Sequence, residues 1–240
     1  MTKVTYMAHC GYIVTLDDVV FVFDYVHDPS HALKKTLEQN PDKPVIFFIT
    51  HQLVNNNHFN PGNFEMAQNH RRVYVVSNSV PADLIPSTLE VAGMSAGDIV
   101  EDLPGNIKVQ AYKTTEKGVC FVVSQPGGIK MLHAGELNLW DLPDETGRKE
   151  YNRDEERYCS IVKRIADDYP ELDIAMMNVN PRISLDYAQG ARELCKRIKI
   201  KDFFPMDIDG DTKEACDFDI YLPEGTTGHC LHVPGQSVNL

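Results

Sequence analysis

The stretch FFITHQLVNNNHFN, residues 47–60, decides how the rest of this sequence is interpreted. A strand typical of a buried sheet, 45–49, runs directly into a polar turn that carries His51, three consecutive asparagines and His58. α/β proteins commonly build a site in this way, because the sheet holds the strand end while the loop carries the chemistry. We therefore expect the functional site at the end of this strand.

Four further predicted strands also end on residues that can bind a cation or move a proton. Together with the strand before His51, the five endings are Asp24, His51, His133 followed by Glu136, Asn178 followed by Asn180, and Asp207. One such ending is commonplace, but five suggest one shared edge where loops converge, and α/β sheets place their ligands at such an edge.

Hydrophobic periodicity and turn residues predict a β-rich first half and a second half in which strands and helices alternate. Strands are expected at 3–7, 12–16, 19–24, 45–49, 73–77, 107–111, 119–124, 129–133, 172–177 and 202–206, with a final hairpin of 229–233 and 237–240. Helices are expected at 30–39, 82–92, 155–168 and 186–198, and a short one after Pro61. No linker interrupts the pattern, so we predict one domain.

Composition excludes some classes of function. The 240-residue chain has a net charge of −12, which argues against nucleic-acid binding through a basic face. It has neither a leader-like N-terminus nor an 18-residue apolar run, so we expect a soluble cytoplasmic protein that is not bound to a membrane. Its six cysteines form no CxxC pair, and we expect them to be reduced thiols.

Five segments, taken in order, resemble the motifs of a known family. They are AHCGYIV (8–14), VVFVFDY (19–25), PVIFFITH with HFNP (44–51 and 58–61), HAGELNLW (133–140) and FFPMDI (203–208). The chain is similar to metallo-β-lactamase-fold proteins, and in particular to the bacterial hydrolases that resemble ascorbate-6-phosphate lactonase. The resemblance implies an α/β (α+β) four-layer αββα sandwich over residues 1–240. It also implies a cation, between the sheets at one edge, that activates water.

The departures from the family pattern fall on the metal ligands. Six residues separate His51 from His58, which makes the loop two residues longer than in the family motif. Asn57 stands where the family has an aspartate that binds metal and accepts a proton. Glu136 replaces the bridging aspartate, and Asp207 replaces the last histidine.

These replacements predict one altered metal site. Zinc prefers imidazole and thiolate, and a neutral amide contributes little. The position nearest His51 keeps only that histidine and Glu136, which are too few ligands for a metal. We therefore expect the metal at the position nearest His58, which combines it with Glu136, Asp207 and Asn57. Two carboxylates with one imidazole can hold a single ion and favour a harder cation such as Mn²⁺ or Mg²⁺, whereas the resemblance implies Zn²⁺.

Three hypotheses for function follow. The first is a metal-dependent hydrolase of lactones, phosphoesters or related bonds, in which Glu136 acts in catalysis and His133 and Asp24 orient the ligands. The second is a metal-free pseudoenzyme that binds a ligand or regulates, because the amide of Asn57 cannot accept a proton. The third is metal-free acid–base chemistry by His9, His133 or Glu136.

The sequence predicts a class of binding partner, a small-molecule substrate. Arg153 and Arg157 lie in a charged segment that we place near the mouth of the site. They could bind an anionic group of a small-molecule substrate, although a solvated helix face explains them as well. Homodimers are frequent among proteins with this fold.

Overall fold

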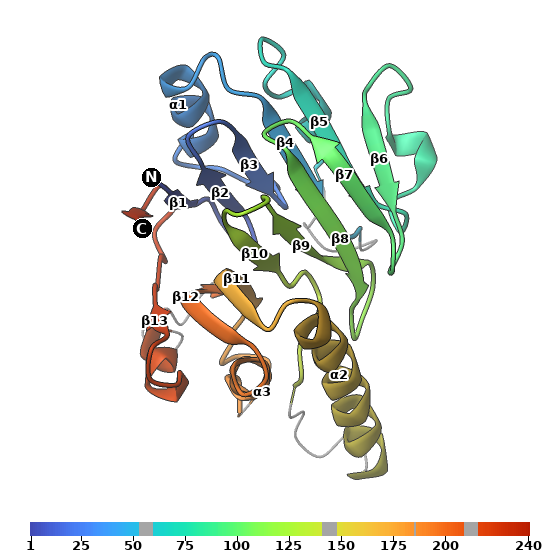
Figure 1. The fold of residues 1–240 in the computed structure, drawn as a ribbon, viewed down its shortest axis with the longest axis vertical. Helices are drawn as coiled ribbons and strands as arrows, with labels where there is room; N and C mark the ends of the chain where they lie inside the picture. Colours follow the sequence, from blue (N-terminus) through green and yellow to red (C-terminus); the bar gives the residue numbers. More distant parts are fainter. Residues whose placement is uncertain (53–59, 141–147, 185, 209–215) are drawn as a thin grey trace.

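Figure 1 shows the computed structural model of the chain, which describes residues 1–52, 60–140, 148–184, 186–208 and 216–240. Two β-sheets form its centre.

The first sheet has seven strands among the described residues, in the order β14-β1-β2-β3-β4-β5-β6. Strands β1, β2 and β3 pair antiparallel, whereas β3, β4, β5 and β6 run parallel. Their bounds are β1 (Lys3–Tyr6), β2 (Tyr12–Thr15), β3 (Val20–Phe23), β4 (Val45–Ile49), β5 (Arg72–Ser77), β6 (Val91–Met94) and β14 (Ser237–Asn239).

The second sheet also has seven strands in the described part of the chain, in the order β13-β12-β11-β10-β9-β8-β7. Strands β7 to β10 are antiparallel, and β10 to β13 are parallel. Their bounds are β7 (Ile99–Leu103), β8 (Ile107–Lys113), β9 (Val119–Ser124), β10 (Lys130–His133), β11 (Glu171–Asn178), β12 (Lys199–Met206) and β13 (Thr227–Gly228).

Helices cover the outer faces of both sheets, which gives the αββα sandwich that was predicted (Figure 1). Helix α1 lies on the first sheet, while α2 and α3 lie beside the second and are joined by a hydrogen bond from the Tyr158 hydroxyl to the Gly190 carbonyl (2.6 Å). The helices are α1 (Ala32–Gln39), α2 (Arg148–Asp168) and α3 (Gln189–Cys195), with 3₁₀ turns η1 (Pro61–Glu65), η2 (Ala82–Leu84) and η3 (Asp217–Tyr221).

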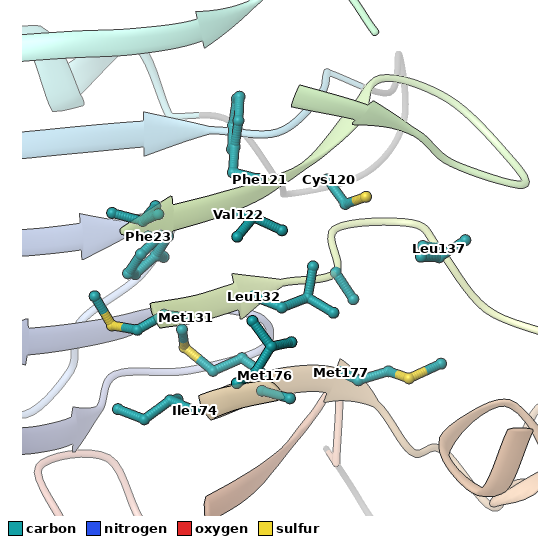
Figure 2. Packing of buried hydrophobic residues seen from close by; sticks show 14 of the residues in the cluster. Phe23, Cys120, Phe121, Val122, Met131, Leu132, Leu137, Ile174, Met176 and Met177 are labelled. Atoms are coloured by element: carbon teal, nitrogen blue, oxygen red, sulfur yellow. The ribbon is translucent and has the colours of Figure 1, made fainter. Parts of the chain in front are cut away.

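The apolar strands before the predicted site bury both of their faces. In β4, Phe47 packs toward α1, whereas Ile46 and Phe48 point into the core between the sheets. A strand alternates its side chains between two faces, so a continuous apolar run fits only where both are covered. Figure 2 shows the core between the sheets, in which Phe23 of β3 lies among residues of β9, β10 and β11.

Two elements predicted from the sequence are wrong. Residues 82–92 do not form a helix: η2 ends at Leu84, and β6 then begins at Val91. Pro86 lies inside the expected helix, where it would clash with the preceding turn and remove a hydrogen bond. The final hairpin is also wrong, because residues 229–233 form no strand and β14 pairs with β1 of the first sheet. The edge strand β7 was missed, because its exposed residues leave no clear alternation.

The cysteine prediction is wrong at two positions. Cys216 and Cys230 form a disulfide with Cα atoms 5.3 Å apart, while Cys10, Cys120, Cys159 and Cys195 are free. Spacing in the sequence does not reveal which cysteines the fold brings together.

No helix in the described part of the chain combines the length and apolarity needed to cross a lipid bilayer.

Helix α1 depends on one carboxylate that precedes it. Asp28 accepts hydrogen bonds from the backbone amides of Ala32 and Leu33 and from the Ser30 hydroxyl, each at 2.9 Å. We expect Asp28→Ala to lower the free energy of unfolding by about 1–2 kcal/mol, because it leaves these amides without their cap. Urea denaturation measures the loss, with exposed Asp42→Ala as the control; an equal effect of both variants would contradict the capping role.

Candidate functional site

The parallel strands of both sheets bring their carboxyl ends to one edge of the sandwich. Strand β3 pairs with β4 in the first sheet, and β10, β11 and β12 run side by side in the second. Hydrogen bonds then join the two sheets: Asp207 N donates to the His9 carbonyl (3.1 Å), and the Cys10 thiol lies 3.4 Å from Asn178 Oδ1. The five polar strand endings therefore do converge.

A buried carboxylate organises the first sheet's side of this edge. Asp24 follows β3 in a left-handed conformation (φ 39°) and is only 1% exposed. It accepts a hydrogen bond from Thr50 N (2.8 Å) at Oδ1 and another from the Thr50 hydroxyl (2.6 Å) at Oδ2. A buried carboxylate needs such donors, since its charge is otherwise costly to remove from water.

This pairing determines which nitrogen of His51 carries a proton. The single hydroxyl proton of Thr50 is donated to Asp24, yet Thr50 Oγ1 also lies 2.8 Å from His51 Nδ1. Nδ1 must then be the donor of that second hydrogen bond. In the neutral ring, the lone pair is consequently on Nε2.

The Nε2 atom of His51 faces a carboxylate. It lies 3.3 Å from Glu136 Oε1, and the His51 side chain is fully buried while that of Glu136 is 17% exposed. Burial would lower the pKa of His51, but the hydrogen-bonding Glu136 carboxylate and the charge of Asp24 together raise it above the ordinary value. A lone pair and a carboxylate oxygen at this distance favour a positive charge beside them, either a proton or a cation.

Tight turns bring Glu136 to this position. Gly135 has φ 53°, and Thr115 Oγ1 donates to the Glu136 carbonyl (3.0 Å). Gly118, directly before β9, lies against Thr50 and His51 with φ 75°. A Cβ atom there would lie 2.1 Å from the Thr50 carbonyl oxygen and 2.5 Å from His51 Cβ, so only glycine fits.

His133 lies behind this cluster rather than in it. Its ring is fully buried and stacks on Phe23, with centroids 5.1 Å apart. Nε2 lies 2.9 Å from the Cys10 carbonyl and therefore donates to it, while Nδ1 lies 3.9 Å from Asp24 Oδ2. His133 can thus reach a ligand only through its neighbours.

Asp207 occupies the second sheet's side of the same edge. It follows β12 with φ 54°, and Asn180 Nδ2 donates to its Oδ2 (2.8 Å). In the described residues, the ligand atoms of His51, Glu136 and Asp207 do not all lie within 4.8 Å of one another. The close pair is therefore His51 with Glu136, and Asp207 lies elsewhere on the same edge.

The sequence-predicted site is brought together in part. His51, Glu136, Asp24 and His133 belong to one contact network, and Asp207 joins the same edge. The predicted ligands Asn57 and His58 lie outside the described residues. Sequence reasoning missed Thr50, although a hydroxyl residue directly before His51, at a strand end that neighbours Asp24, is a usable signal.

Comparison with known proteins identifies the fold. No family model and no curated protein matches the sequence. Among solved structures, the novel metallo hydrolase Igni18 from Ignicoccus hospitalis is 15% identical with a TM-score of 0.68, covering 99% of this chain and 97% of its own. A possible metal-dependent hydrolase from Veillonella parvula (TM-score 0.64) and the metallo-β-lactamase fold protein YhfI from Bacillus subtilis (0.63) are each 11% identical, with 100% of both chains covered. The chain therefore has the metallo-β-lactamase fold.

The close approach at Gly118 gives a test of how the site is packed. We expect Gly118→Ala to destabilise the protein by at least about 2 kcal/mol more than Gly127→Ala, since contacts this short force the backbone of Thr50 and His51 to move. Gly127 is a matched control because it has a similar φ of 66°, but a Cβ there would meet no atom within 4 Å. Equal losses in urea denaturation would show that backbone conformation, and not crowding against His51, limits this position.

Proposed function

We propose that this protein is a metal-dependent hydrolase that acts on a small molecule, with one divalent cation held beside His51 and Glu136. The observation that carries the proposal is the orientation of the buried His51 ring. Its Nδ1 proton is committed to Thr50, which leaves the lone pair on Nε2, and this atom lies 3.3 Å from a carboxylate oxygen of Glu136. A histidine that binds metal through one nitrogen and donates the other N–H to a fixed acceptor is the usual arrangement in metalloenzymes.

The donor set of the described residues fits a cation. One imidazole nitrogen of His51 lies 3.3 Å from the carboxylate of Glu136, and the carboxylate of Asp207 lies at the same edge of the sandwich. Metal-dependent hydrolases among the structural neighbours support the same class of site. A ligand set rich in carboxylate oxygen suits Mn²⁺ as well as Zn²⁺, because none of the side chains of His51, Glu136 and Asp207 is a thiolate. The sequence-predicted ligand His58 would complete the set.

The cation would supply Lewis-acid activation of a water molecule and of the bond under attack. The protein's own residues would orient the ligands and accept a proton. Asp24 and Thr50 hold the His51 ring and its tautomer, and His133 supports Asp24 from behind; these three are positioning residues, since they are buried. Glu136 is partly exposed, so its carboxylate can accept the proton that the amide of Asn57 cannot.

The proposed substrate is a small molecule with a lactone, phosphoester or related bond and an anionic group. Arg157 of α2 reaches the loop beside His51, where its Nη2 lies 3.4 Å from the Thr114 carbonyl. Thr114 and Gly118 belong to the same loop, so this contact brings a guanidinium toward the candidate site. Guanidinium groups bind carboxylates and phosphates through paired hydrogen bonds.

The decisive experiment measures metal content and hydrolysis on the same samples. Protein with its disulfide intact is incubated with Mn²⁺ or Zn²⁺, dialysed and assayed by elemental analysis, and then tested on a panel of lactones and phosphoesters. We expect about one equivalent of metal and metal-dependent hydrolysis in the wild type. Glu136→Gln should lose both, because it removes a ligand and the proton acceptor.

The matched control is Glu116→Gln, which removes the same charge from an exposed position in the loop that precedes β9. It should retain metal and activity. His58→Ala tests the predicted ligand that lies outside the described residues. If the wild type binds neither ion, the proposal fails, and the metal-free ligand-binding alternative takes its place.

The hydroxyl of Thr50 offers a separate test of the positioning role. We expect Thr50→Val to lower the affinity for Mn²⁺ by roughly 10–100-fold, because the Nδ1–H of His51 loses its acceptor and the ring is no longer oriented. Thr50→Ser keeps the hydroxyl and should bind nearly as well as the wild type. Isothermal titration calorimetry measures both, and equal affinities of the two variants would contradict the relay through Thr50.

A further inference from the structure

A second group of potential metal ligands lies away from the candidate site. Cys216, Cys230 and His232 each offer one ligand atom, and these atoms all lie within 4.8 Å of one another. Among the described residues this is the one group of three side chains of ligand type that meets so closely. The two sulfurs form the disulfide, and Cys216 Sγ lies 3.8 Å from His232 Nδ1.

Non-covalent contacts hold the Cys216 side of this group in place. Cys216 lies directly before η3, whose Phe218 is 1% exposed and packs on Phe203 of β12 with ring centroids 5.4 Å apart. Gly228 of β13 approaches Phe218 so closely that an added Cβ would lie 3.1 Å from its ring. The start of η3 is therefore anchored to the second sheet by burial of an aromatic ring.

The Cys230 side is anchored to the same strand. Its neighbour His229 donates its backbone N–H to the Phe203 carbonyl (2.8 Å), and its Nε2 lies 2.7 Å from Asp202 Oδ1. The His229 ring also stacks on Phe204, with centroids 4.7 Å apart. Both cysteines are thus placed by β12 and its neighbours, so they remain close together when the bond between them is broken.

The third member of the group is oriented by its own turn. Gln236 Oε1 accepts the backbone N–H groups of His232 and Val233, each at 2.9 Å. The His232 ring is exposed, and its Nδ1 lies 3.4 Å from the Cys230 carbonyl as well as 3.8 Å from Cys216 Sγ. Tetrahedral zinc separates a thiolate and an imidazole nitrogen by about 3.6 Å, given its usual bond lengths. The observed spacing needs little change to reach that value.

We propose that Cys216, Cys230 and His232 form a redox-gated binding site for a thiophilic divalent cation such as Zn²⁺. In the oxidised protein the sulfurs are bonded to each other and cannot act as thiolates. A dithiol reductant converts the disulfide to two thiols and becomes a disulfide itself, supplying two electrons and two protons. The cation then displaces the two thiol protons and bonds both sulfurs and His232 Nδ1, while the ring proton moves to the exposed Nε2.

This site differs in chemistry from the proposed catalytic centre. Two thiolates and one imidazole select soft or borderline ions, whereas the ligands beside His51 are imidazole and carboxylate. Three protein ligands leave the fourth position of a tetrahedral ion open to water or another ligand. The proposal does not depend on hydrolytic activity, and either site can fail without the other.

Cobalt(II) tests the proposal, because sulfur bound to it gives a thiolate-to-metal charge-transfer absorption in the near ultraviolet. The full-length protein is reduced with a phosphine, desalted under nitrogen and titrated with Co²⁺. We expect this absorption to saturate at about one equivalent in the reduced wild type and to be absent while the disulfide is intact. Cys216→Ser and Cys230→Ser should lose it, and His232→Ala should require more Co²⁺ to reach saturation. Cys159→Ser, a free and half-buried cysteine outside the group, is the matched control and should behave as the wild type.

A second measurement uses only the wild-type protein, so its result does not depend on whether the variants fold. Adding a small-molecule disulfide to the cobalt-loaded protein should re-form the Cys216–Cys230 bond and release one equivalent of Co²⁺, with loss of the absorption. The proposal is overturned if the reduced wild type shows no charge-transfer absorption. It is equally overturned if the absorption persists in Cys216→Ser or if the disulfide reagent leaves it unchanged.

Discussion

The hydrogen-bond relay from Asp24 through Thr50 to His51 is the interaction on which the candidate site depends. Each step constrains the next. The buried carboxylate accepts the hydrogen bond of the Thr50 hydroxyl, whose oxygen accepts a hydrogen bond from Nδ1–H of His51. The lone pair of the neutral ring is then on Nε2, 3.3 Å from Glu136 Oε1. The relay exists because β3 and β4 run parallel and end together, so that Asp24 and Thr50 become neighbours. The pairing of β3 with β4 thereby determines which nitrogen of the neutral His51 ring carries the hydrogen.

Much of this edge could be predicted from the sequence because strands impose simple rules. Apolar runs such as 19–23 and 45–49 identify strands buried on both faces, and polar residues at their ends identify the edge of the sheet. The prediction that His51 and Glu136 share a site also needed the resemblance to the metallo-β-lactamase motifs, because β4 and β10 belong to different sheets. Thr50 was missed because its role depends on three atoms meeting in space, which periodicity does not encode. Its position directly after a strand, where a β-branched residue is common, already explained its presence.

Other features could not be read because they depend on tertiary context. Residues 91–94 become an edge strand only because β5 offers them a partner, and residues 227–228 and 237–239 join different sheets although a Pro-Gly turn precedes the latter. The disulfide follows the same logic, since Cys216 and Cys230 meet through the packing of Phe218 and His229 on β12. Local propensity is a weak guide wherever pairing with a distant strand determines the outcome.

Strand β12 is common to both proposed cation sites, and this has a chemical consequence. Its carboxyl end carries Asp207 at the candidate centre, while Asp202, Phe203 and Phe204 in its middle anchor the segment that holds Cys230. The two proposed sites share a scaffold but differ in ligand type, so they prefer different ions. Carboxylate oxygen binds the hard ion Mn²⁺, and thiolate does not compete for it. Zn²⁺ suits both donor sets. Under both proposals, total zinc in the purified protein would be the sum of two equilibria, one of which is controlled by the thiol–disulfide balance. Manganese alone would report on the proposed centre beside His51.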